Sequence, residues 1–183
     1  MKELNSKAKP ISRNEIQEIV RKFRRSLDME YTNRFPIVEF FENVLPIIIE
    51  DFQYEYVPID EMKEKEGLTM PDKKTILIRE DIYRKAVNND GRSRLTFAHE
   101  IWHLIAHGSE NISFCKLEEG KHLKKYENPE WQADVFGAEL LAPSYLIAEL
   151  SEQEISDKFC VSNKCAQTQK YYALKGGGLH ARF

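Results

Sequence analysis

Hydrophobic residues recur at intervals of three and four near the start of the chain. Ser12 and Glu15 match the capping box that begins many helices. The apolar positions that follow at helical spacing are Ile16, Ile19, Val20, Phe23 and Leu27. We therefore expect an amphipathic first helix, preceded by a flexible polar segment over residues 1–10. A second short helix is expected to begin at Pro36 and to stop at Pro46, because proline suits the first turn of a helix and breaks its interior.

Alternation of apolar and polar residues indicates two strands. Residues 52–57 alternate apolar or aromatic with polar side chains, and residues 74–78 form a short β-rich run after a Pro-Asp turn. We expect a small sheet of two or three strands. This sheet precedes a helix expected over residues 95–106, and a sheet edge can bind an extended peptide by adding it as a further strand.

The segment from Leu95 to Ala106 is apolar on almost every side, which is typical of a buried helix. Three short helical segments follow Pro143, and the second of them opens with a Ser151/Glu154 capping box. The pattern as a whole predicts an α+β fold, a mostly helical single domain with a small two- to three-stranded sheet packed beside the buried helix.

The expected domain spans residues 11–175. It has a core over 74–143 and C-terminal helices over 144–175, and a flexible tail follows over 176–183.

Two histidines in the buried helix lie four residues apart. His99 and His103 enclose Glu100 in the pattern His-Glu-x-x-His. On an α-helix both imidazoles lie on nearly the same face, one turn apart, so both can bind one metal ion. Glu100 then lies beside the pair, where it can take a proton from a water molecule. The pattern is short, and the alternative is an ordinary helix with surface or core histidines. Burial favours ligation, because unsatisfied buried polar groups cost on the order of a few kcal/mol each.

A zinc site of this type needs a third protein ligand. His107 lies too far along the helix, roughly 12 Å of axial rise from the first histidine. The elongated motif with a third histidine is excluded because Ala106 and Ser109 occupy its required positions. Glu130 and Asp134, one turn apart, offer one carboxylate for the metal and one for the far N–H of a ligating histidine. The alternative is a solvated acidic helix start, which the helix dipole favours in any case.

Two segments of the chain resemble the signature helices of the ImmA/IrrE-type family of small zinc metallopeptidases, in the family's order. The matching segments are Leu95–His107 and Glu130–Pro143. The resemblance implies that His99, His103 and Glu130 hold one Zn2+ per chain. It implies Glu100 as the general base, and Asp134 then orients one imidazole.

The chain departs from the family pattern at two places. Ile101 and Trp102 replace the usual leucine and glycine, so we expect the large indole to lie beside the metal and to narrow access to it. Gly137 replaces an alanine, which costs the helix roughly 1 kcal/mol but permits closer helix packing.

Residues 109–128 are polar and irregular, so we expect a loop that covers the site as a lid or selects the substrate. Within it, His122 or Tyr126 is a candidate to polarise the scissile carbonyl. The alternative is that both are ordinary loop residues.

Length, charge and cysteine content narrow the class of protein. A chain of 183 residues suits one domain with a real core, and a net charge of −3 does not favour a nucleic-acid partner. The three cysteines, Cys115, Cys160 and Cys165, have no zinc-ribbon spacing, which favours reduced thiols in the cytoplasm. We expect neither a signal peptide nor a membrane span.

The sequence therefore predicts a zinc-dependent metallopeptidase that hydrolyses a peptide bond in a selected protein. The resemblance implies a helix-turn-helix transcriptional repressor as the substrate, in the setting of transcription regulation on mobile genetic elements. Two alternatives stay open. One is a metal-binding regulatory protein that recognises its partner without cleaving it. The other is a DNA-binding regulator that uses the last two helices, which have the length of a helix-turn-helix.

Overall fold

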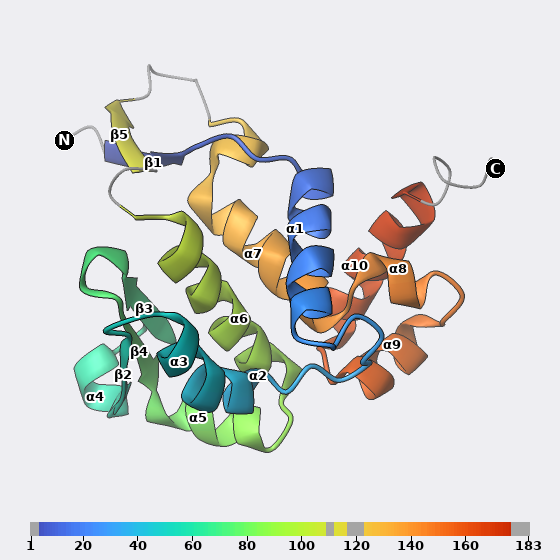
Figure 1. Cartoon of the computed structure of the whole chain (residues 1–183), viewed down its shortest axis with the longest axis horizontal. Helices are drawn as coiled ribbons and strands as arrows, with labels where there is room; N and C mark the ends of the chain where they lie inside the picture. The colour runs from blue at the N-terminus through green and yellow to red at the C-terminus, as the bar shows by residue number, and fades with distance from the viewer. Residues whose placement is uncertain (1–3, 109–111, 117–122, 177–183) are drawn as a thin grey trace.

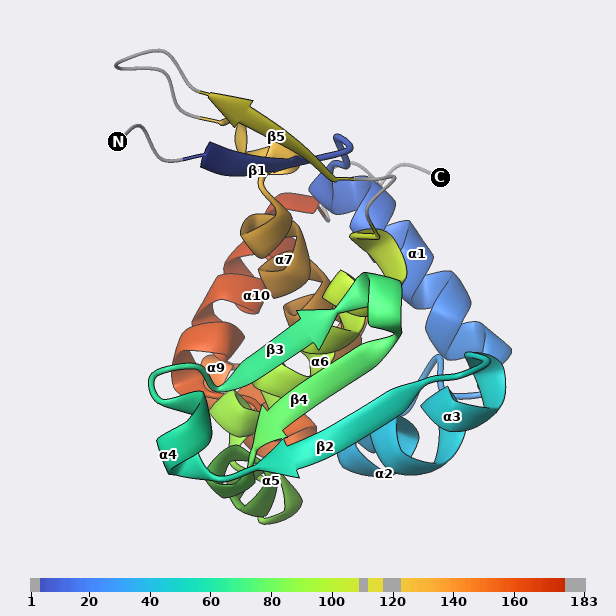
Figure 2. The ribbon, with the colours of Figure 1, turned by 90° about the vertical axis from the view of Figure 1, so that its left-hand side faces the viewer.

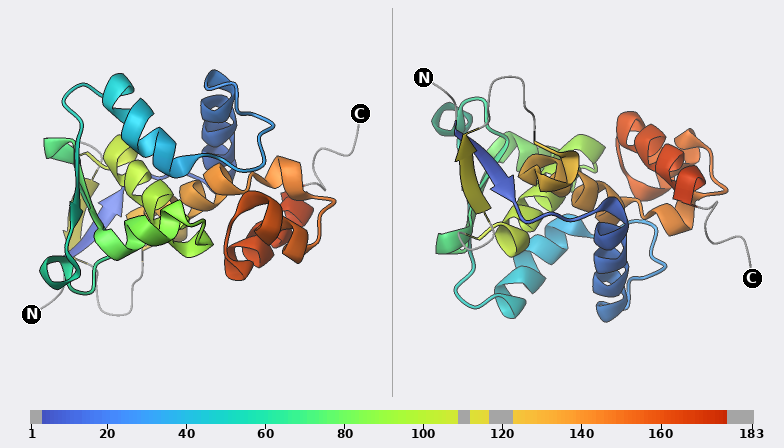
Figure 3. Two further views of the ribbon diagram at one scale, coloured as in Figure 1. Left: turned by 90° about the horizontal axis from the view of Figure 1, so that it is seen from below. Right: turned by 90° about the horizontal axis from the view of Figure 1, so that it is seen from above.

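Two buried helices, α6 (Gly91–Ala106) and α7 (Pro129–Leu141), pack against each other in the middle of the molecule (Figure 1). The structure is a computed structural model that describes residues 4–108, 112–116 and 123–176. A small sheet lies at one end of the helix pair, and the C-terminal helices lie at the other (Figure 3). The expected α+β fold, mostly helical with a small sheet beside the buried helix, is confirmed.

The sheet beside α6 has three strands in the order β2-β4-β3 (Figure 2). These are β2 (Gln53–Val57), β3 (Gly67–Met70) and β4 (Thr75–Arg79). The central strand β4 pairs in parallel with β2 and antiparallel with β3. Its Ile76 and Ile78 are fully buried. The expected sheet of two or three strands is confirmed, and β2 and β4 are the two strands located in the sequence. Strand β3 was not located, because it is only four residues long and all four are half-buried.

Short helical elements connect the strands to one another and to α6. They are α4 (Ile59–Met62), η2 (Pro71–Lys73) and α5 (Glu80–Val87). The Asp90 side chain caps α6 by accepting a hydrogen bond from the Ser93 N–H.

The capping box of the first helix, α1 (Arg13–Ser26), is confirmed: Ser12 and Glu15 each bond the other's backbone N–H. The expectation that Pro46 stops the second helix is wrong. Three short elements run on from one another there, namely α2 (Ile37–Glu39), the π-helix η1 (Phe40–Val44) and α3 (Leu45–Ile48). The Leu45 N–H bonds Phe40 O, five residues back. This wider turn accommodates Pro46, which has no N–H to donate.

A separate two-stranded ribbon joins two segments that we expected to be irregular. Strand β1 (Leu4–Ala8) pairs antiparallel with β5 (Ile112–Lys116), so Leu4 lies opposite Lys116. The expected flexible start over residues 1–10 and the irregular loop over 109–128 thus each contain a strand. Neither segment alternates clearly in sequence, and each finds its hydrogen-bonding partner only through the tertiary fold.

The C-terminal helices are α8 (Ser144–Ile147), α9 (Glu152–Phe159) and α10 (Asn163–Gly176). The Ser151/Glu154 capping box of α9 is confirmed. On α6, the buried Arg94 donates hydrogen bonds to the carbonyls of Phe35 and Cys160, which ties the C-terminal helices to the core. Among the described residues, no helix is both long and apolar enough to cross a membrane.

The close approach of α7 to α6 depends on Gly137. A Cβ atom at this position would lie 2.9 Å from Leu95 Cδ1 and 3.4 Å from both Ala98 Cβ and the His99 nitrogen. Gly137 therefore permits the closer packing that its place in the sequence suggested.

We expect Gly137→Leu to lower the free energy of unfolding by about 1–3 kcal/mol, because the larger side chain must push the two central helices apart. Urea unfolding measures this change. Thr168→Leu, at an exposed position of α10, is the control and should change stability little. An unchanged unfolding midpoint in Gly137→Leu would contradict the close packing of α6 on α7.

Candidate metal centre

Three side chains from α6 and α7 meet with one ligand atom each directed at the same place. The Nε2 atoms of His99 and His103 lie 3.0 Å apart. Glu130 brings one carboxylate oxygen to 3.3 Å from His99 Nε2 and the other to 3.4 Å from His103 Nε2. Ligands at zinc–nitrogen distances of 2.0–2.1 Å in a tetrahedron are about 3.3 Å from one another. The spacing and chemistry of this group therefore fit a zinc ion.

The start of α7 determines where Glu130 lies. Asn128 caps the helix by accepting hydrogen bonds from the N–H groups of Glu130 and Trp131, and Pro129 occupies the first turn. Glu130 and Asp134 then lie one helical turn apart, and both are exposed. As the sequence suggested, the Glu130 carboxylate lies near both imidazole Nε2 atoms, and the Asp134 carboxylate lies on the far side of the His99 ring.

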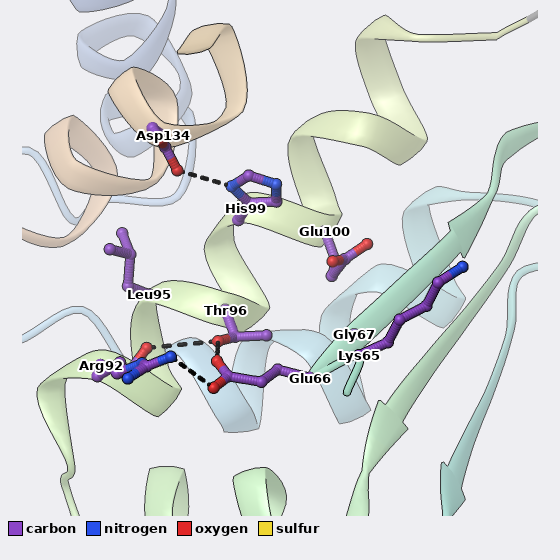
Figure 4. A pocket seen from close by; sticks show the side chains of 9 residues that line it. All are labelled: Lys65, Glu66, Gly67, Arg92, Leu95, Thr96, His99, Glu100 and Asp134. Atoms are coloured by element: carbon purple, nitrogen blue, oxygen red, sulfur yellow. Dashed lines mark hydrogen bonds and ion pairs between the residues drawn. The ribbon is translucent and has the colours of Figure 1, made fainter. Parts of the chain in front are cut away.

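Asp134 holds the far nitrogen of His99, with 3.0 Å between its Oδ1 and the ring Nδ1 (Figure 4). A carboxylate only accepts, so Nδ1 carries a proton, and Nε2 is the nitrogen that offers its lone pair to a metal once the ring has lost its second proton. Burial lowers the pKa of His99, but hydrogen bonds to Asp134 and Glu130 outweigh it and raise this pKa to about 9. Hydrogen bonds from the imidazoles of His103 and His99 hold the pKa of Glu130 well below its usual range.

His107 lies behind His103, away from the three ligand atoms. Its Nδ1 is 2.8 Å from His103 Nδ1, and its Nε2 is 2.9 Å from Gln132 Oε1. Burial lowers the pKa of His107 to about 4, so the ring is neutral near pH 7. The sequence excluded His107 as a ligand by distance, but it gave no role to Gln132.

Glu100 points from α6 toward strand β3 (Figure 4). Thr69 Oγ1 lies 2.6 Å from the Glu100 carboxylate and 3.0 Å from its carbonyl oxygen. A Cβ atom on Gly67 would come within 2.6 Å of the Glu100 side chain. Strand β3 thus holds the carboxylate with a hydroxyl and makes room for it with a glycine. Neither residue was predicted from the sequence, because the run Gly-Leu-Thr-Met before the Pro-Asp turn is too short to indicate a strand by itself.

A cavity of about 300 Å³ opens beside Glu100 and His99. An ion pair lies along its wall, with 2.7 Å between the Arg92 guanidinium and the Glu66 carboxylate (Figure 4). The residues that line it are Lys65, Glu66, Gly67, Arg92, Leu95, Thr96, His99, Glu100 and Asp134. The space next to the metal ligands is therefore open on the side of β3.

Trp102 does not narrow this space, contrary to expectation. Its side chain is 3% exposed and stacks on Phe136 of α7, with ring centroids 4.6 Å apart. Its ring is also nearly perpendicular to that of His107, with ring centroids 6.2 Å apart. The indole therefore lies in the core between α6 and α7, and not in the open cavity beside Glu100.

Of the two candidates to polarise a carbonyl, Tyr126 lies on the short 3-10 helix η3 (Lys125–Glu127). Its ring is exposed and is not among the described residues that line the cavity. The structure therefore does not bring Tyr126 to the site, and His122 lies outside the described residues.

The model of the peptidase M78 family, an IrrE N-terminal-like domain, matches residues 54–171. The chain belongs to this family. The match includes the sheet, both central helices and most of the C-terminal helices, so the resemblance seen in the two signature segments is confirmed. Membership supports a metallopeptidase-type function in general. Among curated proteins, none matches the chain by sequence.

We expect the affinity for Zn2+ to rise about tenfold per pH unit between pH 7.5 and 9 and then to level off. In the metal-free protein His99 keeps its proton up to a pKa of about 9 and must release it to bind a metal. Competition against a zinc-binding dye measures the affinity. In Asp134→Asn the zinc affinity should stop rising at a lower pH, because one hydrogen bond that raises the pKa of His99 is weakened. Equal affinity at pH 7.5 and 9 would show that His99 is not a ligand that loses a proton on binding.

Proposed function

We propose that this protein is a zinc-dependent peptidase that hydrolyses a peptide bond in a selected protein. The observation that supports this most is the meeting of two imidazole nitrogens and a carboxylate at one point, with Glu100 beside them at an open cavity. His99, His103 and Glu130 would hold the zinc ion. When bound, zinc supplies a Lewis acid that polarises the substrate carbonyl and makes a water molecule easier to deprotonate.

The residues of the chain would divide the remaining work as follows. Glu100 takes a proton from water as the water oxygen attacks the carbonyl carbon, and it gives that proton to the nitrogen when the carbon–nitrogen bond breaks. The Thr69 hydroxyl holds the Glu100 carboxylate in place. Asp134 keeps the proton of His99 on Nδ1. The open cavity beside Glu100 gives the substrate room to approach.

Replacing Glu100 by Gln should keep zinc bound and lower peptide hydrolysis by about 10²–10⁴-fold, because the amide has the same shape but cannot accept a proton. Zinc content by elemental analysis and cleavage rate are measured on the same preparation. His103→Ala and Glu130→Ala are the comparison variants and should lose zinc as well as activity. Full activity in Glu100→Gln would remove this residue from the mechanism.

The proposed substrate is a helix-turn-helix repressor encoded beside the protein, in the cytoplasm and in the setting of mobile genetic elements. The family's regulatory setting suggests this substrate. The cavity supports a selective site, because about 300 Å³ lies at the small end of ligand pockets. A cavity of this size has room for only a few side chains of the substrate protein.

Direct nucleic-acid binding is not part of the proposal. Helix α9 exposes three acidic residues, Glu152, Glu154 and Asp157, which would repel phosphates. Its apolar side, with Ile155 and Phe159, is buried in the core.

With zinc present, we expect cleavage of the neighbouring repressor at one or a few bonds and little hydrolysis of casein. Mass spectrometry of the products identifies the bonds, and a chelator should abolish the cleavage. Rapid, unselective digestion of casein would contradict selectivity while leaving the zinc chemistry intact. Tight binding of the repressor with no cleavage at any zinc concentration would instead favour the non-catalytic regulator.

A further inference from the structure

Gln132 is a buried amide whose orientation is fixed by the main chain. It lies on α7 and is 2% exposed. Its Nε2 donates to the carbonyl oxygens of Lys9 at 2.9 Å and Tyr126 at 2.8 Å. Carbonyl oxygens only accept hydrogen bonds, so the amide nitrogen must face them. The amide oxygen therefore faces His107.

The orientation of Gln132 determines which nitrogen of His107 carries the proton. Gln132 Oε1 lies 2.9 Å from His107 Nε2 and can only accept, so this nitrogen carries the hydrogen. A neutral imidazole has one N–H, which leaves His107 Nδ1 as an acceptor. His103 Nδ1 lies 2.8 Å from it and must donate. The lone pair of His103 is then on Nε2, the atom that faces His99 and Glu130.

We propose that Gln132 and His107 are positioning residues that fix the tautomer and ring orientation of the metal ligand His103. The fixed end of this hydrogen-bond chain is the pair of main-chain carbonyls of Lys9 and Tyr126. The inference rests on the proposed zinc ligation, and it extends that ligation to two residues that do not touch the metal.

The two ligating imidazoles are thus held in different ways. His99 donates to the exposed carboxylate of Asp134. His103 donates to a buried neutral ring, where a carboxylate would cost far more to bury than an uncharged acceptor. The hydrogen-bond chain needs no charge at any step, which suits the apolar surroundings that Trp102 and Phe136 provide.

A purely structural role for these buried groups makes a different prediction, and Gln169 provides the matched control. This glutamine lies on α10, is fully buried, and donates through Nε2 to the Ala142 carbonyl at 2.8 Å. Its amide oxygen accepts from Arg13 at 3.2 Å. It therefore resembles Gln132 in burial and bonding, but it has no contact with the histidines.

The experiment measures the Zn2+ dissociation constant by dye competition, and the unfolding midpoint of the metal-free protein in chelator. Gln132→Met and His107→Leu should weaken zinc binding about 10–100-fold. His107→Asn should recover part of the loss, since its side-chain oxygen can occupy the place of Nδ1 and accept from His103. Gln169→Met should lower the unfolding midpoint and leave the zinc affinity unchanged.

Wild-type affinity in folded Gln132→Met and His107→Leu would overturn the proposal. Equal losses of affinity in Gln132→Met and Gln169→Met would also overturn it, because packing alone would then explain the effect. If the wild-type protein bound no zinc, the proposed ligand set would fail together with this inference. Stoichiometric zinc with no effect of Gln132 or His107 would overturn the inference alone.

Discussion

The contact between α6 and α7 is the constraint on which the metal centre depends. Helix α6 alone provides two imidazoles on one face, but the third ligand and the group that orients His99 both come from α7. Gly137 allows the two helices to approach closely, and the stacking of Trp102 on Phe136 fills the same interface with apolar surface. A shift of either helix would move Glu130 away from both imidazole Nε2 atoms at once.

The same contact explains how the two ligating imidazoles are oriented, with one Nε2 atom each toward the place where the three ligand atoms meet. Each ring has one nitrogen directed at the other ligands, and a residue of α7 fixes the opposite side of each ring, directly or through His107. Asp134 bonds His99 directly, whereas Gln132 acts on His103 through His107. Because Asp134 is exposed and Gln132 is buried, the centre has one side open to solvent and one side closed.

Local features of the site could be predicted from the sequence, because spacing along a helix fixes which side chains share a face. The pairing of His99 with His103, and of Glu130 with Asp134, needs only helical geometry. The direction of Trp102 could not be predicted in this way. Helix α6 is apolar almost all round, so its pattern does not say which side meets α7 and which meets the sheet.

Features that depend on contacts distant in sequence were also missed. The pairing of β1 with β5 joins segments that are far apart in the sequence, and neither shows a strand pattern alone. Strand β3 is recognisable only beside β4, and without it neither Gly67 nor Thr69 can be connected to Glu100. The continuation of the helical segment past Pro46 likewise depends on a π-turn, which local propensity does not indicate.

The arrangement of open and closed sides also indicates how a substrate would reach the centre. Trp102, His107 and Gln132 fill the closed side, whereas the cavity opens between α6 and strand β3. In the described part of the chain β3 is an edge strand of its sheet, with β4 on one side. An extended peptide that entered the cavity would therefore pass beside Gly67, where the absence of a side chain lets the backbone and Glu100 come close together. The glycine that makes room for the proposed base thus also lies beside the space open to the substrate.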